Sequence, residues 1–245
     1  MTEAEKARTT NETGLSEYLR DGERVDDLLV NGLKIIQNPS AFCFGCDAVE
    51  IANFVTGGAK DRAVDLGSGT GIITLLLGGK KGIRCTGVEI QPDMAEMSRR
   101  SIEMNNLCGV CDIINAPMQS VREHFPSGYA TIVVSNPPYR KKDGGAAIDN
   151  ESVALARHEI AVTLREVADS AAYLTRPGGR FYLIHRADRL AEIIYECKKR
   201  RLEPKVLQTL VPAPNKPPHL IMLKCVKDGK EGLEILPERV VDTVV

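Results

Sequence analysis

The chain has 245 residues, of which 43% are hydrophobic, so it is long and apolar enough for one large domain with a buried core. A formal net charge of −1 excludes a molecule-wide field that attracts polyanions, so any nucleic-acid contact must come from local basic patches. No apolar run reaches the roughly 18 residues of a membrane span. Because the first residues are polar, we expect a cytoplasmic protein without a membrane partner, whose seven cysteines are reduced thiols.

Three regions follow from the change in composition along the chain. Residues 1–16 are polar and predict a flexible tail, and residues 17–60 predict an N-terminal extension that packs on the core. Within this extension, Asp47 is placed to cap the N-terminus of a helix that reaches Phe54. Residues 61–245 form the main domain.

Strand and helix patterns alternate through the main domain. Strands are predicted at residues 62–66, 84–89, 110–114, 130–134, 181–184, 206–210 and 220–225. Helices are predicted at residues 72–77, from Pro92 to Met104, at 152–174 and at 188–201. This alternation predicts an α/β fold, with a doubly wound, mostly parallel, seven-stranded Rossmann-like sheet.

The segment Ser135-Asn136-Pro137-Pro138-Tyr139 follows the fourth strand directly. Two prolines fix two φ angles and remove two backbone donors, so the turn is rigid at the carboxyl edge of the sheet, where open α/β sheets bind ligands. A side-chain amide and an aromatic ring at this spacing suit a flat, hydrogen-bonding group that is stacked. The alternative is a proline turn that only ends the strand.

A glycine-rich turn follows the first strand. Gly67, Gly69 and Gly71 allow close approach of the backbone to a ligand, and no Gly-Lys-Ser/Thr follows, which excludes a P-loop. Asp65 precedes the glycines, and Glu89 ends the next strand, where an acid typically pairs with ribose hydroxyls. The two acids favour a cationic, nucleoside-bearing cofactor over a pyrophosphate. Taken singly, each acid is equally consistent with a loop-capping carboxylate.

Two motifs carry a family resemblance. The segment from Val64 to Gly71 resembles the first motif of class I S-adenosylmethionine-dependent methyltransferases, and Asn136 to Tyr139 resembles the fourth motif of those that methylate amino or amide nitrogens. The chain further resembles, over roughly residues 20–240, the bacterial tRNA (adenine-N6)-methyltransferases that modify the adenosine 3′ of the anticodon (position 37) of a valine tRNA. This narrower resemblance rests on Ile35-Ile36-Gln37, Phe42-Cys43-Phe44-Gly45-Cys46-Asp47-Ala48-Val49, Arg157-His158-Glu159-Ile160 and Ile184-His185-Arg186-Ala187-Asp188-Arg189-Leu190.

The resemblance implies a set of site residues. The catalytic residues would be Asn136, Pro137 and Tyr139. The residues that bind S-adenosylmethionine would be Asp65, Gly67, Gly69, Gly71, Glu89, Asn115 and Asn136. The residues that bind the tRNA would be Phe44, Arg140, Lys141, Lys142, Arg186 and Arg189. Asn115 departs from the pattern, because many relatives have an acid that holds the cofactor's adenine there.

The cysteine pairs Cys43-x-x-Cys46 and Cys108-x-x-Cys111 have the spacing of zinc ligands. The first pair alternates with phenylalanines and the second flanks a core strand, where cysteine is a small apolar filler, so no metal is predicted.

Other functions compete with tRNA methylation. The proline turn suits a protein glutamine amide equally well, and another RNA or DNA amino group is a further target. A non-catalytic RNA-binding protein that kept the fold is disfavoured by the intact Asp65, Glu89, Asn136 and Tyr139. The glycine spacing disfavours a nicotinamide dehydrogenase. The motifs leave the oligomeric state open, with a monomer favoured.

Overall fold

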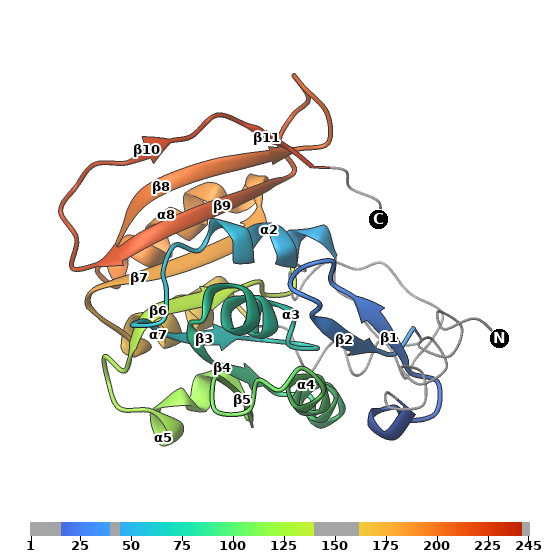
Figure 1. The fold of residues 1–245 in the computed structure, drawn as a ribbon. Helices are drawn as coiled ribbons and strands as arrows, with labels where there is room; N and C mark the ends of the chain where they lie inside the picture. Colours follow the sequence, from blue (N-terminus) through green and yellow to red (C-terminus); the bar gives the residue numbers. More distant parts are fainter. Residues whose placement is uncertain (1–15, 40–44, 140–161, 242–245) are drawn as a thin grey trace, which may run out of the picture.

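The computed structural model describes residues 16–39, 45–139 and 162–241, which build a twisted nine-stranded sheet covered by helices and a separate two-stranded hairpin (Figure 1). The sheet has the strand order β10-β8-β9-β7-β6-β3-β4-β5, and β11 also pairs with β8. Its strands are β3 (Arg62–Leu66), β4 (Arg84–Glu89), β5 (Cys111–Asn115), β6 (Ala130–Ser135), β7 (Thr175–Arg186), β8 (Leu202–Val211), β9 (Leu220–Lys227), β10 (Glu234–Ile235) and β11 (Arg239–Val240).

The seven predicted strands are confirmed as β3 to β9, in a sheet of nine strands, with earlier starts for β7 and for β8, which begins at Leu202 and not at 206. β7 begins at Thr175, six residues before the predicted start at 181, because Thr175 already pairs with Ala130 of β6, and a bulge with Gly178 at a φ of 73° follows before the regular pairing resumes at Arg180. The two-residue strands β10 and β11 were not predicted, since their exposed side chains leave no hydrophobic pattern.

Strand direction brings the functional ends together. β5, β4, β3, β6 and β7 pair in parallel, while β9 pairs antiparallel with both β7 and β8. The carboxyl ends of five neighbouring parallel strands therefore meet at one edge of the sheet, the place where ligands bind in open α/β folds.

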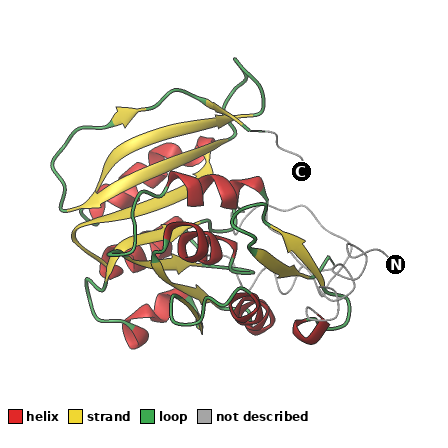
Figure 2. Cartoon of the chain, viewed as in Figure 1, coloured by secondary structure: helices red, strands yellow, loops and turns green. Residues whose placement is uncertain are grey.

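Helices cover both faces of the sheet (Figure 2). They are α2 (Cys46–Phe54), α3 (Ile72–Leu75), α4 (Pro92–Met104), α5 (Val121–His124), α7 (Leu164–Leu174) and α8 (Leu190–Lys199), with a π-helical turn η2 (Leu76–Lys80) and short 3₁₀ turns η1 (Ser16–Tyr18), η3 (Met118–Ser120) and η4 (Ala187–Arg189). One core packs α2, α3 and α4 on the sheet, and the other packs α5, α7 and α8. Ala63 faces the first core and Val64 the second, as expected for strands buried on both faces.

Two helix starts differ from the sequence-based expectation. α2 begins at Cys46 with Gly45 as its N-cap, so Asp47 lies inside the first turn and is not the cap. α7 begins at Leu164, where Thr163 and Glu166 form a capping box, so the predicted helix over 152–174 is wrong at residues 162 and 163. The earlier part of that prediction lies outside the described residues.

The N-terminal extension contains a hairpin that was predicted only as an apolar stretch. β1 (Arg24–Asp27) pairs antiparallel with β2 (Lys34–Gln37), and the backbone N–H of Ile36 donates to Ser101 Oγ on α4 at 3.0 Å. Leu33, Ile35 and Ile51 are buried in the same core as the sheet. The division of the chain at residue 60 stays a prediction, and the predicted tail lies almost wholly outside the described residues. Among the described residues, no helix is both long and apolar enough to cross a membrane.

Candidate active site

Asp65 is the penultimate residue of β3, and its carboxylate is fully buried. Its Oδ2 accepts a hydrogen bond from Thr74 Oγ1 at 3.0 Å, while its Oδ1 has no partner. Burial, and to a lesser extent the charge of Glu89, raise the pKa of Asp65 to about 7. A buried carboxylate oxygen without a donor is costly, so this position is suited to an incoming cation or hydrogen-bond donor.

The glycine turn leads from β3 into α3 and is tied to β4. The backbone N–H groups of Gly67 and Ser68 donate to Val88 O at 2.9 and 3.1 Å. Gly71 is the N-cap of α3 with a φ of 85°, and a Cβ at this residue would lie 1.9 Å from Ser98 Oγ on α4. Glycine is therefore required at residue 71 both by the backbone conformation and by the close packing of α4.

Glu89 closes β4 and is 4% exposed. Its Oε2 accepts from the Gly69 N–H at 2.8 Å and its Oε1 from the Gln91 N–H at 2.9 Å. The carboxylate thus joins the glycine turn to the start of α4. Each oxygen keeps a second lone pair, which leaves acceptor capacity for a ligand hydroxyl.

Asn115 closes β5 beside Glu89. Its Nδ2 donates to the carbonyl oxygens of Glu89 and Ile90 at 2.8 and 3.0 Å, which leaves its side-chain oxygen turned away from these two contacts. Ile90 is 41% exposed although it follows a buried strand. Sequence reasoning missed Ile90; the signal was an apolar residue immediately after the strand-end acid.

The turn after β6 holds the Asn136 and Tyr139 side chains. Ser135 is buried and its Oγ donates to Leu66 O at 2.8 Å, which fixes the turn against the end of β3. The next residues are half-buried Asn136, buried Pro137 and exposed Pro138. Because β6 pairs in parallel with β3, Asn136 lies at the same edge of the sheet as Asp65.

Tyr139 joins three elements through its hydroxyl and its ring. Its Oη lies 2.6 Å from Asp47 Oδ2 on α2 and 2.7 Å from Asn136 Oδ1. Its ring meets the ring of His185, at the end of β7, edge-on with 5.2 Å between centroids. Burial first, and then Asp47, raise the pKa of the Tyr139 hydroxyl above its ordinary value, so the phenol stays protonated at neutral pH.

His185 is buried beneath this tyrosine. Burial lowers its pKa to about 4, and its Nδ1 accepts from the backbone N–H of Arg186 at 2.8 Å, so the imidazole is neutral at neutral pH. Its ring packs against the ring of Tyr139.

The basic residues predicted for RNA binding divide into two groups. Arg186 at the end of β7 pairs with Asp188, and Arg189 pairs with Glu192. Arg186 is more than half exposed, while Arg189 is mostly covered. Phe44, Arg140, Lys141 and Lys142 lie outside the described residues.

The two cysteine pairs differ in their surroundings. Cys111 is buried, with its Sγ 3.4 Å from Thr74 O, while Cys108 and Cys46 are exposed. Cys43 falls outside the described ranges. Within the parts of the chain that the structure describes, no three His, Cys, Asp or Glu residues gather as metal ligands.

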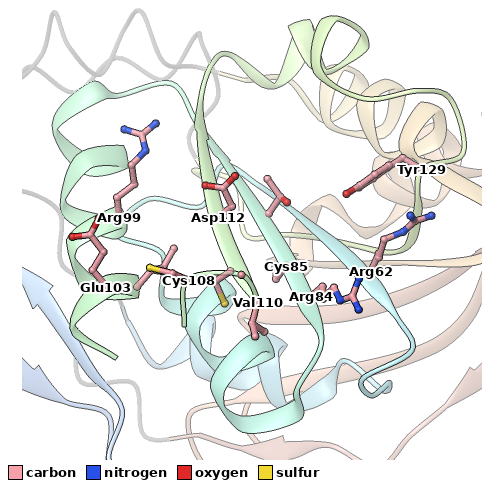
Figure 3. A pocket seen from close by; sticks show the side chains of 13 residues that line it. Arg62, Arg84, Cys85, Arg99, Glu103, Cys108, Val110, Asp112 and Tyr129 are labelled. Atoms are coloured by element: carbon pink, nitrogen blue, oxygen red, sulfur yellow. The ribbon is translucent and has the colours of Figure 1, made fainter. Parts of the chain in front are cut away.

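A hollow of about 520 Å³ lies at the opposite, amino-terminal ends of β3, β4 and β5 (Figure 3). Arg62, Arg84 and Tyr129 reach it from one side and Arg99 from α4 on the other, and the Arg62 guanidinium lies 4.7 Å from the centre of the Tyr129 ring. None of the predicted site residues that lie in the described ranges lines it. The candidate active site is therefore defined by the strand ends that carry Asp65, Glu89 and Asn136.

Comparison with known proteins gives relatives of similar length. A Porphyromonas gingivalis protein described as tRNA1(Val) (adenine(37)-N6)-methyltransferase is 28% identical over 200 residues, covering 77% of this chain and 76% of the relative. A Parabacteroides distasonis protein with the same description is 23% identical over 182 residues, covering 74% of this chain and 75% of that protein.

Solved structures share the fold at low identity. A predicted O-methyltransferase from Agrobacterium tumefaciens superposes with a TM-score of 0.62 and 21% identity, over 79% of this chain and 85% of that one. A Pyrococcus horikoshii protein, TYW2 in complex with MeSAdo, superposes with a TM-score of 0.59 and 13% identity, over 86% of this chain and 73% of that one.

The family model of the methyltransferase small domain matches residues 48–188, more than half of the chain. This segment contains the strand ends with Asp65, Glu89 and Asn136 and the glycine turn. The chain belongs to the methyltransferase small domain family.

Proposed function

We propose that this protein transfers a methyl group from S-adenosylmethionine to the N6 amino group of an adenine in tRNA, at position 37 of a valine tRNA. The observation that carries the proposal is the Asn136 to Tyr139 turn, held at the same edge of the sheet as the buried Asp65 and Glu89. The names of the two relatives, each of which covers about three quarters of the chain, support the choice of tRNA.

The residues at the strand ends fit S-adenosylmethionine. The unpartnered Oδ1 of Asp65 offers a buried acceptor for a cationic ammonium, and the free lone pairs of Glu89 offer acceptors for ribose hydroxyls. Exposed Ile90 and the Asn115 side-chain oxygen offer an apolar surface and an acceptor for an adenine ring. When bound, the cofactor supplies an electrophilic methyl group.

The turn residues supply what a weak nucleophile needs. The lone pair of an adenine amino group is delocalised into the ring, so the nitrogen attacks poorly. The Asn136 side-chain oxygen and the Pro137 carbonyl would accept its two N–H bonds, draw it toward tetrahedral geometry and aim its lone pair at the methyl carbon. Alignment of this kind alone contributes several kcal/mol. The amino group loses one proton after transfer, so no dedicated base is needed.

An adenine in the anticodon loop is accessible to such a site. Loop bases are single-stranded and are extruded at lower cost than a base in a duplex. Tyr139 would stack on the flipped base, and exposed Arg186 would contact a neighbouring phosphate. Phe44 and the run from Arg140 to Lys142 are proposed as further substrate contacts.

The proposal is tested with an unmodified valine tRNA transcript and labelled S-adenosylmethionine, followed by nucleoside analysis. We expect N6-methyladenosine from the wild type and a loss of about 100-fold or more in Asn136→Ala, the range found on removing one transition-state hydrogen-bonding group. Cofactor affinity should fall far less than the rate, because Asp65, Glu89 and Asn115 would still hold the rest of the cofactor. Asn53→Ala, on the exposed side of α2 and bonded to Lys80, is the matched control.

Two results would contradict the proposal. One is full methylation by Asn136→Ala. The other is equal labelling of a transcript in which adenosine 37 is replaced by guanosine. Transfer to a protein glutamine amide with no label in tRNA would favour the alternative substrate.

A further inference from the structure

The Tyr139 hydroxyl has one proton and lies within hydrogen-bond distance of two acceptor atoms. Asp47 Oδ2 is 2.6 Å away and Asn136 Oδ1 is 2.7 Å away. A protonated phenol can donate to only one of them, while its lone pairs can accept from a donor. In this arrangement one of the two close contacts joins two oxygens without a hydrogen between them.

Asp47 is the stronger of the two acceptors. Hydrogen bonds to a carboxylate are stronger than those to a neutral amide oxygen. Asp47 also lies in the first turn of α2, where the helix favours a negative side chain, and its Oδ1 accepts from the Ala48 N–H at 2.9 Å. The Tyr139 proton therefore belongs to the contact with Asp47.

Only one orientation of the Asn136 amide then gives Tyr139 Oη a hydrogen-bond donor. A half-turn of the amide exchanges Oδ1 and Nδ2, two atoms that occupy nearly the same space. Nδ2 would then donate to Tyr139 Oη, and Oδ1 would face the open edge of the sheet. The Tyr139 ring packs edge-on against buried His185, and this contact favours the position of the hydroxyl beside Asn136.

We infer that Asp47 is a positioning residue, which acts through Tyr139 to turn the Asn136 side-chain oxygen toward the substrate amino group. The inference rests on the proposed function, because it assigns the task of that oxygen. Without Asp47, Asn136 Oδ1 is the one acceptor among the described residues that is left for the Tyr139 proton. Asn136 Oδ1 would then accept a hydrogen bond from Tyr139 and would face away from the substrate.

The kinetic test compares Asp47→Ala, Tyr139→Phe and the double variant in steady-state tRNA methylation. We expect each single variant to lower kcat at least tenfold, with KM for tRNA and cofactor affinity within twofold of the wild type. The double variant should be no slower than the slower single variant, because each substitution breaks the same chain of hydrogen bonds from Asp47 through Tyr139 to Asn136. Tyr182→Phe is the control, since it removes a buried tyrosine hydroxyl that bonds Thr56 just beyond α2, away from Asn136.

A spectroscopic test needs no substrate. The side-chain amide signals of Asn136, assigned by their absence in Asn136→Ala, should shift in both Asp47→Ala and Tyr139→Phe and stay unchanged in Tyr182→Phe.

Three results would overturn the inference: a kcat of Asp47→Ala within twofold of the wild type, losses that multiply in the double variant, or Asn136 amide signals that do not move in Asp47→Ala. A wild type that does not methylate tRNA would count against the proposed function alone, because the spectroscopic test still decides the role of Asp47.

Discussion

Asp65 shows how one residue couples the site to stability. Its pKa of about 7 lies above the ordinary aspartate value, so the native state holds this proton more tightly than the unfolded chain. The stabilising contribution of the protonated form is complete below about pH 4 and is lost as pH rises toward 7.

Asp65→Asn should therefore stabilise the protein at pH 8. The substitution removes a buried charge, and we expect a gain in the free energy of unfolding of roughly 2–4 kcal/mol, since each pKa unit corresponds to about 1.4 kcal/mol. The gain should shrink as pH falls from 7 to 4. Urea unfolding of variant and wild type at several pH values measures this difference. A gain that is absent at pH 8, or that grows toward pH 4, would contradict the pKa of Asp65.

Sequence reasoning found the site residues that belong to a local pattern. Asp65 and Glu89 lie at the carboxyl ends of strands, and the glycine turn and Asn136 follow strands directly, so their common edge could be predicted from topology alone. Asp47 was interpreted as a helix cap, because its partner Tyr139 is 92 residues away and no periodicity reports such a contact. Ile90 was missed for a related reason: its exposure depends on what packs around the end of β4.

At the scale of elements, α7 begins with reciprocal capping. Thr163 Oγ1 accepts from the Glu166 N–H at 3.2 Å, and the Glu166 carboxylate accepts from the Thr163 N–H at 2.8 Å. Thr163→Ala should lower the free energy of unfolding by about 1 kcal/mol, the usual cost of a lost N-cap. Thr163→Ser keeps the hydroxyl and should lose much less. Equal unfolding midpoints in urea for all three proteins would show that the cap contributes nothing.

The strands that the sequence predicted are the longer ones, which bury much of their length. β6 is buried along its whole length and is mostly apolar, because it lies between two helical layers, and β3 is buried after its first residue. β1 and β2 have four residues each, and β10 and β11 have two. Such strands are too short to show a hydrophobic pattern of their own, so their pairing depends on the segments that surround them. The start of α7 was misplaced because an alanine-rich composition continues upstream of its cap.

At the scale of the whole molecule, charge near the active edge should matter more than charge elsewhere. Arg186 ends β7 at this edge, whereas Arg201 precedes β8 at the opposite edge, and both are exposed and paired with an aspartate. Arg186→Ala should weaken tRNA binding several-fold. It should also reduce the steepness of the plot of the logarithm of the binding constant against the logarithm of salt concentration by about 1, as expected for one phosphate contact. Arg201→Ala should change neither. Filter binding at several salt concentrations measures both, and equal losses in the two variants would exclude a specific contact at Arg186.

The short strands β10 and β11 have a consequence for how copies of the protein meet. They occupy the outer edge of β8, so that side of the sheet offers few free backbone groups to another strand. At the other margin, the Arg99 side chain donates to Ile113 O on β5 at 3.1 Å, so an added strand would have to displace it. Both margins of the sheet resist strand addition from a neighbouring molecule, which protects the protein against edge-to-edge aggregation at high concentration.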